Sequence, residues 1–202
     1  GAFQRLERGE LVLEDFVPEF ERELREGGLT LGLSVEELFK RMEECLVVRE
    51  DVAMAVKSIR AEGLKTAALT NNWVRRSGES LLGFAGGREL SSLFDVVHES
   101  CRTGRRKPDP AAYEGVLEAL KLSKTPECAI FLDDLGSNLK AARELGIRTI
   151  KVGEEAAPAL GELREALGFP LDEYVPGTKS VRASMRFDHA ALELYLGGCG
   201  AP

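Results

Sequence analysis

Apolar residues recur at helical spacing through the first quarter of the chain. Over residues 13–24 they fall three or four positions apart, and a pair of glycines ends this pattern. A second helix is predicted from Val35, because Ser34 and Glu37 form a capping box at its start. Since no strand pattern occurs in this part, the sequence predicts that the first fifty residues are helical.

After residue 50 the pattern changes to an alternation of helices and short apolar strands. Further helices are predicted over 52–59, from Asp109 as a cap, and over 137–145 and 158–167. Four nearly continuous apolar runs alternate with the helical segments, and they cover residues 64–72, 93–100, 128–134 and 148–152. Such runs are typical of a parallel sheet covered by helices on both faces. The sequence therefore predicts an α/β fold with a doubly wound parallel sheet.

Composition and charge limit the kinds of partner. The 202 residues, 44% hydrophobic, suit one globular domain with or without a small satellite. A net charge of -7 argues against a nucleic-acid or membrane-surface binder, because both partners are themselves anionic. No run of eighteen apolar residues occurs, so no membrane span is predicted. The four cysteines are widely spaced without a CxxC pair, which indicates a reducing compartment and neither a zinc nor a disulfide framework.

Polar side chains follow three of the four predicted strands. Thr70 and Asn71 follow the first strand, Lys107 follows the second, and Asp133 and Asp134 end the third. The carboxyl ends of strands in an open parallel sheet meet at one edge, where ligands bind. We therefore expect these five side chains to lie close together.

Each group also has a simpler structural explanation when it is taken alone. A Thr-Asn pair after a strand suits a turn, and the sequence Lys-Pro-Asp-Pro suits a turn followed by a helix cap. Two carboxylates before a helix are stabilised by the helix dipole. These explanations stay open for each group, whereas the occurrence of all three groups in one order favours a shared site.

The chemistry of these groups fits phosphoryl binding. Asp133 and Asp134 repel one another at low dielectric unless a cation lies beside them, and Mg²⁺ takes carboxylate oxygens. The Thr70 hydroxyl and the Asn71 amide or backbone N–H are donors suited to phosphate oxygens. Lys107 adds a positive charge that holds a phosphoryl group or offsets a carboxylate. The set predicts a phosphoryl site with Mg²⁺ as its cofactor.

Three segments resemble the second, third and fourth motifs of the haloacid dehalogenase-like (HAD) hydrolase superfamily, at 68–72, 107–120 and 131–147. The resemblance covers nearly the whole chain. It extends to the subgroup containing the phosphatase-like N-terminal domain of soluble epoxide hydrolase and the corresponding region of acyl-CoA dehydrogenase family member 10. It implies a helical cap at residues 1–47 and a HAD-like core at 48–202 that lacks its first strand.

The resemblance also implies a role for each predicted site residue. Thr70 and Asn71 would bind the phosphoryl group, and Lys107 would hold both the nucleophile and the phosphate. Asp133 would support catalysis, and Asp134 would be the magnesium ligand. The implied activity is hydrolysis of a small-molecule phosphate ester through an aspartyl-phosphate.

The resemblance further implies that Asn138 supports the site. The sequence departs from the family pattern at the nucleophile. The family's aspartate nucleophile lies in a D-x-D motif on the first strand, and the 202 residues contain no D-x-D. Because the chain begins with Gly1 inside a helical pattern, we expect an N-terminal truncation that removes the central strand and leaves its neighbours without ladder partners. We therefore expect a chain that is marginally stable and inactive by itself.

Other interpretations stay open. The chain is alternatively a non-catalytic phospho-ligand-binding or scaffold module of a longer multidomain protein; a 2-haloacid dehalogenase shares the fold but does not need the metal that the acidic pair indicates. The basic run at 102–107 is either a solvated loop or an element that steers anions. His98 is predicted to be structural, while Trp73 and Phe84 either line a pocket or pack. An intracellular location, in cytoplasm, peroxisome or mitochondrion, is expected.

Overall fold

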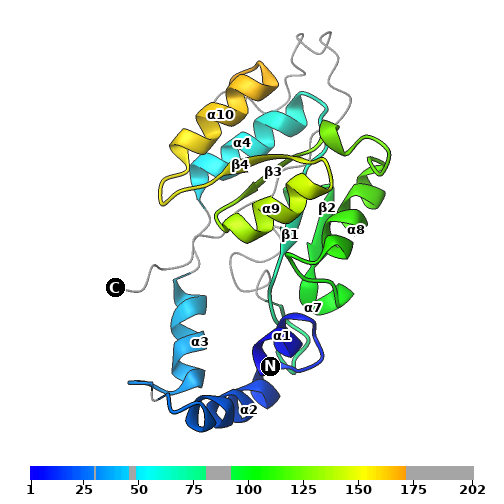
Figure 1. Cartoon of the computed structure of the whole chain (residues 1–202). Coiled ribbons are helices and arrows are strands. Elements are labelled where there is room, and N and C mark those ends of the chain that lie inside the picture. Colours follow the sequence, from blue (N-terminus) through cyan, green and yellow to red (C-terminus); the bar gives the residue numbers. More distant parts are fainter. Residues whose placement is uncertain (30, 46–48, 81–91, 172–202) are drawn as a thin grey trace.

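The computed structural model describes residues 1–29, 31–45, 49–80 and 92–171. Helices alone occupy its first part, and strands alternate with helices in its second part (Figure 1). The helices are α1 (Ala2–Glu7), α2 (Leu13–Glu26), α3 (Val35–Glu44), α4 (Glu50–Ala61), α7 (Ser100–Thr103), α8 (Pro110–Leu120), α9 (Gly136–Glu144) and α10 (Ala157–Leu167), with a 3₁₀ turn η1 (Pro126–Cys128). The strands are β1 (Ala67–Thr70), β2 (Val96–Glu99), β3 (Ile130–Asp133) and β4 (Arg148–Lys151).

The helix caps follow the sequence signals in part. The Ser34 side chain accepts a hydrogen bond from the Glu37 backbone N–H at 3.1 Å, as the capping box predicts. The Glu37 carboxylate instead accepts from Arg41 at 2.9 Å. Asp109 occupies the N-cap position of α8, as the sequence predicts, and its side chain makes no cap hydrogen bond. The fixed φ of Pro110 at the first helical position suits the start of α8.

The strands form two parallel pairs. Strand β1 pairs with β2, with Ala67 opposite Val96, and β3 pairs with β4, with Ile130 opposite Arg148. Among the described residues no ladder joins β1 to β3. The parallel direction confirms the predicted strand arrangement, and the absence of a first strand stays a prediction.

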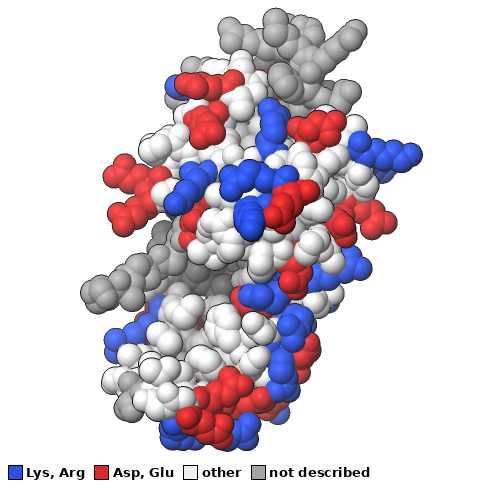
Figure 2. Space-filling model, in the orientation of Figure 1, with Lys and Arg blue, Asp and Glu red and all other residues white. Residues whose placement is uncertain are grey.

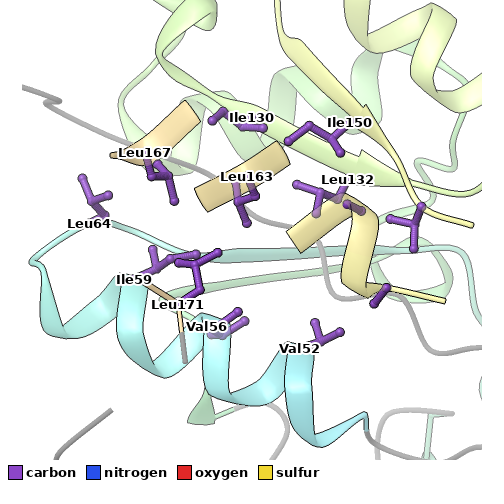
Figure 3. Packing of buried hydrophobic residues seen from close by; sticks show 14 of the residues in the cluster. Val52, Val56, Ile59, Leu64, Ile130, Leu132, Ile150, Leu163, Leu167 and Leu171 are labelled. Atoms are coloured by element: carbon purple, nitrogen blue, oxygen red, sulfur yellow. The ribbon is translucent and has the colours of Figure 1, made fainter. Parts of the chain in front are cut away.

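Two clusters of buried side chains cover the two faces of the strand pairs, and each cluster draws residues from both pairs. Ala68 of β1 and Leu132 of β3 belong to the cluster under α4 and α10. Leu69 and Phe131, one position along each strand, belong to the cluster under α8 and α9. Because neighbouring residues of a strand point to opposite faces, both pairs lie in one layer between the same two helical layers. Figure 3 shows the first cluster, in which leucines of α10 lie over α4 and the strands.

A third cluster joins the first helices to the strand layer. It contains apolar residues of α1, α2 and α3 together with Trp73, which directly follows the β1 region. The Trp73 ring meets the Phe39 ring edge-on with centroids 4.9 Å apart, and the backbone N–H of Leu13 donates to the Val74 carbonyl at 3.0 Å. Trp73 is therefore a packing residue. The division into a cap at 1–47 and a core at 48–202 stays a prediction, and Phe84 lies outside the described residues.

The surface carries mixed charge. On the face shown in Figure 2, basic and acidic side chains are interspersed. No helix in the described part of the chain is both long and apolar enough to cross a bilayer.

We expect Leu163→Ala to lower the free energy of unfolding by about 2–5 kcal/mol, because it leaves a cavity at the centre of the first cluster. Leu163 is 1% exposed and lies between α4 and the strands (Figure 3). The matched control is Glu165→Ala on the solvent side of the same helix, which should change stability by less than about 0.5 kcal/mol. Urea denaturation followed by far-UV circular dichroism measures both, and equal effects of the two variants would contradict this packing.

Candidate active site at the carboxyl ends of the strands

Lys107 brings the ends of β1 and β3 together. The Asn71 side-chain amide donates to the Lys107 carbonyl oxygen at 2.9 Å, and the Lys107 backbone N–H donates to Asn71 Oδ1 at 2.8 Å. The Lys107 ammonium then donates to Asp133 Oδ2 at 2.9 Å. Lys107 thus connects the ends of β1 and β3, which share no ladder among the described residues. Of the five side chains expected together, the contacts join Asn71, Lys107 and Asp133.

Asp133 is buried and engaged on both oxygens. It is 3% exposed, and beyond Lys107 it accepts from the Leu135 backbone N–H at 2.7 Å and from the Asn138 amide at 3.0 and 3.1 Å. A buried carboxylate is tolerable when a counter-charge and hydrogen bonds replace its hydration. The positive charge beside Asp133 is therefore Lys107, so the acidic pair does not by itself require a metal ion for charge balance.

Asp134 has a different environment from its neighbour. Its side chain is half-buried and forms no hydrogen bond or ion pair within the described part of the chain. No group of three or more His, Cys, Asp or Glu side chains arranged to hold a metal occurs among the described residues. Mg²⁺ is commonly held by one or two carboxylates together with substrate phosphate oxygens and waters. The donor set fits a cation shared between Asp134 and a bound phosphate, and it does not fit an all-protein cage.

The two residues after β1 differ in what their side chains can do. The Thr70 hydroxyl lies half-buried at the strand end, and among the described residues its one hydrogen bond is a long one, 3.5 Å, to the Asn71 carbonyl oxygen. The Asn71 amide is committed on both atoms to the Lys107 backbone. The sequence left either the side-chain amide or the backbone N–H of Asn71 as the donor to phosphate. The side-chain amide is therefore disfavoured, and the backbone N–H stays a prediction.

Asn72 anchors the loop after β1, a role that the sequence pattern did not reveal. It is fully buried, its amide donates to Glu99 Oε1 at 2.6 Å, and its backbone N–H donates to Ser100 Oγ at 3.0 Å. The Cys101 thiol donates to Asn72 Oδ1 at 3.0 Å. Burial, reinforced by the Glu99 charge, raises the pKa of the Cys101 thiol to about 11, so the thiol is a neutral donor near pH 7. This network joins the end of β1 to the start of α7.

Glu7 is a second residue that sequence reasoning missed. It ends α1, it is 8% exposed, and its Oε2 accepts from Arg106 Nε at 2.6 Å. Burial raises the pKa of the Glu7 carboxyl, while Arg106, Asn71 and Lys107 act in the opposite direction. The pair spans 99 positions of sequence, so no local pattern could have indicated it.

The basic run at 102–107 is largely neutralised by carboxylates, which weakens its interpretation as a steering element. Three of its four basic side chains form ion pairs: Arg102 with Glu99 at 3.2 Å, Arg106 with Glu7 at 2.6 Å and Lys107 with Asp133 at 2.9 Å.

His98 lies buried on β2, at 7% exposure, and its Nε2 is 2.9 Å from the Thr103 hydroxyl. Burial lowers its pKa, so the ring is held neutral near pH 7. These contacts agree with the predicted structural role.

Comparisons of the sequence identify a family and several relatives. A family model described as haloacid dehalogenase-like hydrolase matches residues 3–146. The chain is 44% identical over 200 residues to acyl-CoA dehydrogenase family member 10 of Mus musculus, covering 98% of this chain and 18% of that protein. It is 32% identical over 179 residues to bifunctional epoxide hydrolase 2 of Rattus norvegicus, covering 86% and 32%. It is 38% identical over 124 residues to phosphatase MT3486 of Mycobacterium tuberculosis, covering 60% and 55%. The chain thus spans a third or less of the first two relatives.

Solved structures share the fold. A predicted HAD-like family hydrolase from Porphyromonas gingivalis superposes with a TM-score of 0.57 at 24% identity, over 81% of this chain and 78% of that one. A HAD family enzyme from Bacteroides thetaiotaomicron, solved as a magnesium complex, superposes with a TM-score of 0.54 at 22% identity, over 75% and 74%.

We expect Lys107→Met to lower the free energy of unfolding by about 3–5 kcal/mol, because it leaves the buried Asp133 charge without its partner. The double variant Lys107→Met with Asp133→Asn should recover most of this loss. Its side-chain oxygen at position 133 still accepts from the Leu135 backbone N–H and the Asn138 amide, and no charge is left buried. The control is Lys124→Met at an exposed position. Urea denaturation compares the four proteins; a double variant no more stable than the single one would show that the buried charge is not the cause.

Proposed function

Because the chain belongs to the haloacid dehalogenase-like hydrolase family, we propose that the residues around Lys107 are the phosphoryl-binding site of a magnesium-dependent phosphomonoester phosphatase domain. The observation that carries the proposal is the double contact of Lys107, whose backbone holds Asn71 after β1 and whose ammonium holds Asp133 at the end of β3. Phosphatases among the relatives support the reaction class.

The charges of the site explain why a cation belongs to it. Lys107 is balanced by Asp133, and Arg106 is balanced by Glu7, so the negative charge of Asp134 is left over. A phosphate monoester carries between one and two negative charges near neutral pH and is repelled by such a site. Mg²⁺ held by Asp134 would neutralise charge on the phosphoryl oxygens. The magnesium complex of a HAD structure supports the choice of metal.

The remaining roles follow from the side chains that face the strand ends. The Thr70 hydroxyl would donate to a phosphoryl oxygen, since its long contact with the Asn71 carbonyl is easily given up. The Lys107 ammonium, with three donor hydrogens, would contact the phosphoryl group while keeping Asp133. Asp133 and Asn138 would act as positioning residues that hold Lys107.

A second candidate function is a phospho-ligand-binding or scaffold module within a longer protein. Two observations favour keeping it: the 202 residues contain no D-x-D, and relatives such as the acyl-CoA dehydrogenase family member are several times longer than the aligned region. The small-molecule phosphate ester would be the ligand in either case, and further domains would decide the biological setting.

The 202 residues alone should bind inorganic phosphate, and Mg²⁺ should tighten that binding by about tenfold or more, because it reverses the sign of the leftover charge. Asp134→Asn should abolish the dependence on Mg²⁺, and Thr70→Val should weaken binding at every Mg²⁺ concentration. Isothermal titration calorimetry provides the affinities, with Glu162→Gln on exposed α10 surface as the matched charge control. Equal Mg²⁺ dependence in wild type and Asp134→Asn would refute the assignment of the metal ligand.

Turnover is expected to be absent from the 202 residues, because the family's aspartate nucleophile has no counterpart among them. A generic chromogenic phosphomonoester with Mg²⁺ is the substrate for this test. Hydrolysis clearly faster than that by the Lys107→Ala variant would contradict this expectation and would favour the enzyme over the binding module for the chain by itself.

A further inference from the structure

A carboxylate of α1 reaches the proposed phosphoryl site from outside the strand layer. Helix α1 lies beside α7 at the lower end of β1 (Figure 1). Its last residue, Glu7, pairs with Arg106 at 2.6 Å, and the two side chains are only 10% and 20% exposed. The pair is therefore shielded from solvent, where its charges interact more strongly than at the surface.

This pair lies directly beside the residues that would hold phosphate. Arg106 precedes Lys107 in the chain, and Lys107 pairs with Asp133. Asn71 and Lys107 are both close enough to Glu7 to favour its charged form. The positive charges of Arg106 and Lys107 thus both act on Glu7, and Arg106 contacts it directly at 2.6 Å.

The position of Glu7 is a costly one for a carboxylate. Burial is the largest influence on its pKa and raises it above the usual 4.5, although the basic neighbours oppose this rise. The folded chain therefore binds a proton at Glu7 more readily than the unfolded chain does, and folding stability declines as the pH rises from about 4.5 through the folded pKa. The charged form of Glu7 is therefore kept in this place against its burial by the Arg106 guanidinium, whose Nε lies 2.6 Å from Glu7 Oε2.

We infer that Glu7 is a specificity-determining residue of the proposed site, an internal anion that neutralises Arg106 and thereby limits the affinity for phosphate. This inference rests on the proposed function. With Glu7 charged, the site holds three carboxylates, those of Glu7, Asp133 and Asp134, and two basic groups, those of Arg106 and Lys107. A phosphoryl group then competes with Glu7 for electrostatic interaction with Arg106. Without that charge the site is balanced and accepts an anion more readily.

The direct test replaces Glu7 by its neutral isostere. Glu7→Gln keeps the size and an acceptor oxygen for Arg106, and we expect it to tighten the binding of inorganic phosphate by about fivefold or more at fixed Mg²⁺ and ionic strength. The matched control is Glu10→Gln, since Glu10 pairs with Arg8 at the same 2.6 Å but both side chains are exposed. Its affinity should stay within about twofold of wild type, because exposed pairs are screened by solvent.

A second measurement uses the wild-type chain and so does not depend on the folding of any variant. The Nε–Hε resonance of Arg106 should shift as inorganic phosphate is titrated, because the guanidinium exchanges part of its interaction with Glu7 for the ligand. Phosphate affinity that is unchanged or weaker in Glu7→Gln, or an Arg106 resonance that stays unmoved at saturating phosphate, would overturn the inference. If wild type binds phosphate with the expected Mg²⁺ dependence, either result removes the role of Glu7 alone; if wild type binds no phosphate, the proposed function falls as well.

Discussion

The buried ion pair between Lys107 and Asp133 is the interaction on which the rest of the site depends. Together with the contact between the Lys107 backbone and Asn71, it joins the carboxyl ends of β1 and β3, between which the described part of the chain forms no ladder. Both groups of the pair are almost excluded from water. Charges in such a place are expensive unless each is paired and hydrogen-bonded. Asn138 and the Leu135 backbone complete the shell of Asp133, so the position of the lysine ammonium is set by a group of contacts that must all be present together.

The same arrangement separates the two members of the acidic pair. Asp133 faces inward and is used up by the protein, whereas Asp134 remains partly exposed and has no partner among the described residues. The two adjacent carboxylates therefore differ in burial and in hydrogen bonding, because consecutive side chains of an extended segment point to opposite sides. In the proposed site Asp134 would meet the cation, together with phosphate oxygens and water, since the described residues hold no group of three or more His, Cys, Asp or Glu side chains arranged for a metal.

The position of these charged groups depends on the hydrophobic clusters that hold the strands together. The strand pairs are held in one layer because both of their faces are buried under helices, and the clusters on each face run across the break between β1 and β3. Hydrophobic burial is not directional, so it brings the pairs together without specifying the contacts at their ends. Those contacts come from the polar network, which Glu7 extends to α1, while Trp73 packs against the apolar residues of the first helices.

Local sequence patterns predicted the longer helices, the four strands and their parallel direction, but not the short helix α7. They also placed Thr70, Asp133 and Asp134 at strand ends, and Lys107 in the segment that follows β2. These features are readable because periodicity, caps and glycine stops act within a few residues of chain. Tertiary structure decided the use of the Asn71 amide, the anchoring by Asn72 and the pairing of Glu7 with Arg106. Each of these depends on which distant group lies within hydrogen-bond reach after folding, and a distance of 2.6 Å between residues 99 positions apart leaves no trace in the pattern of either segment.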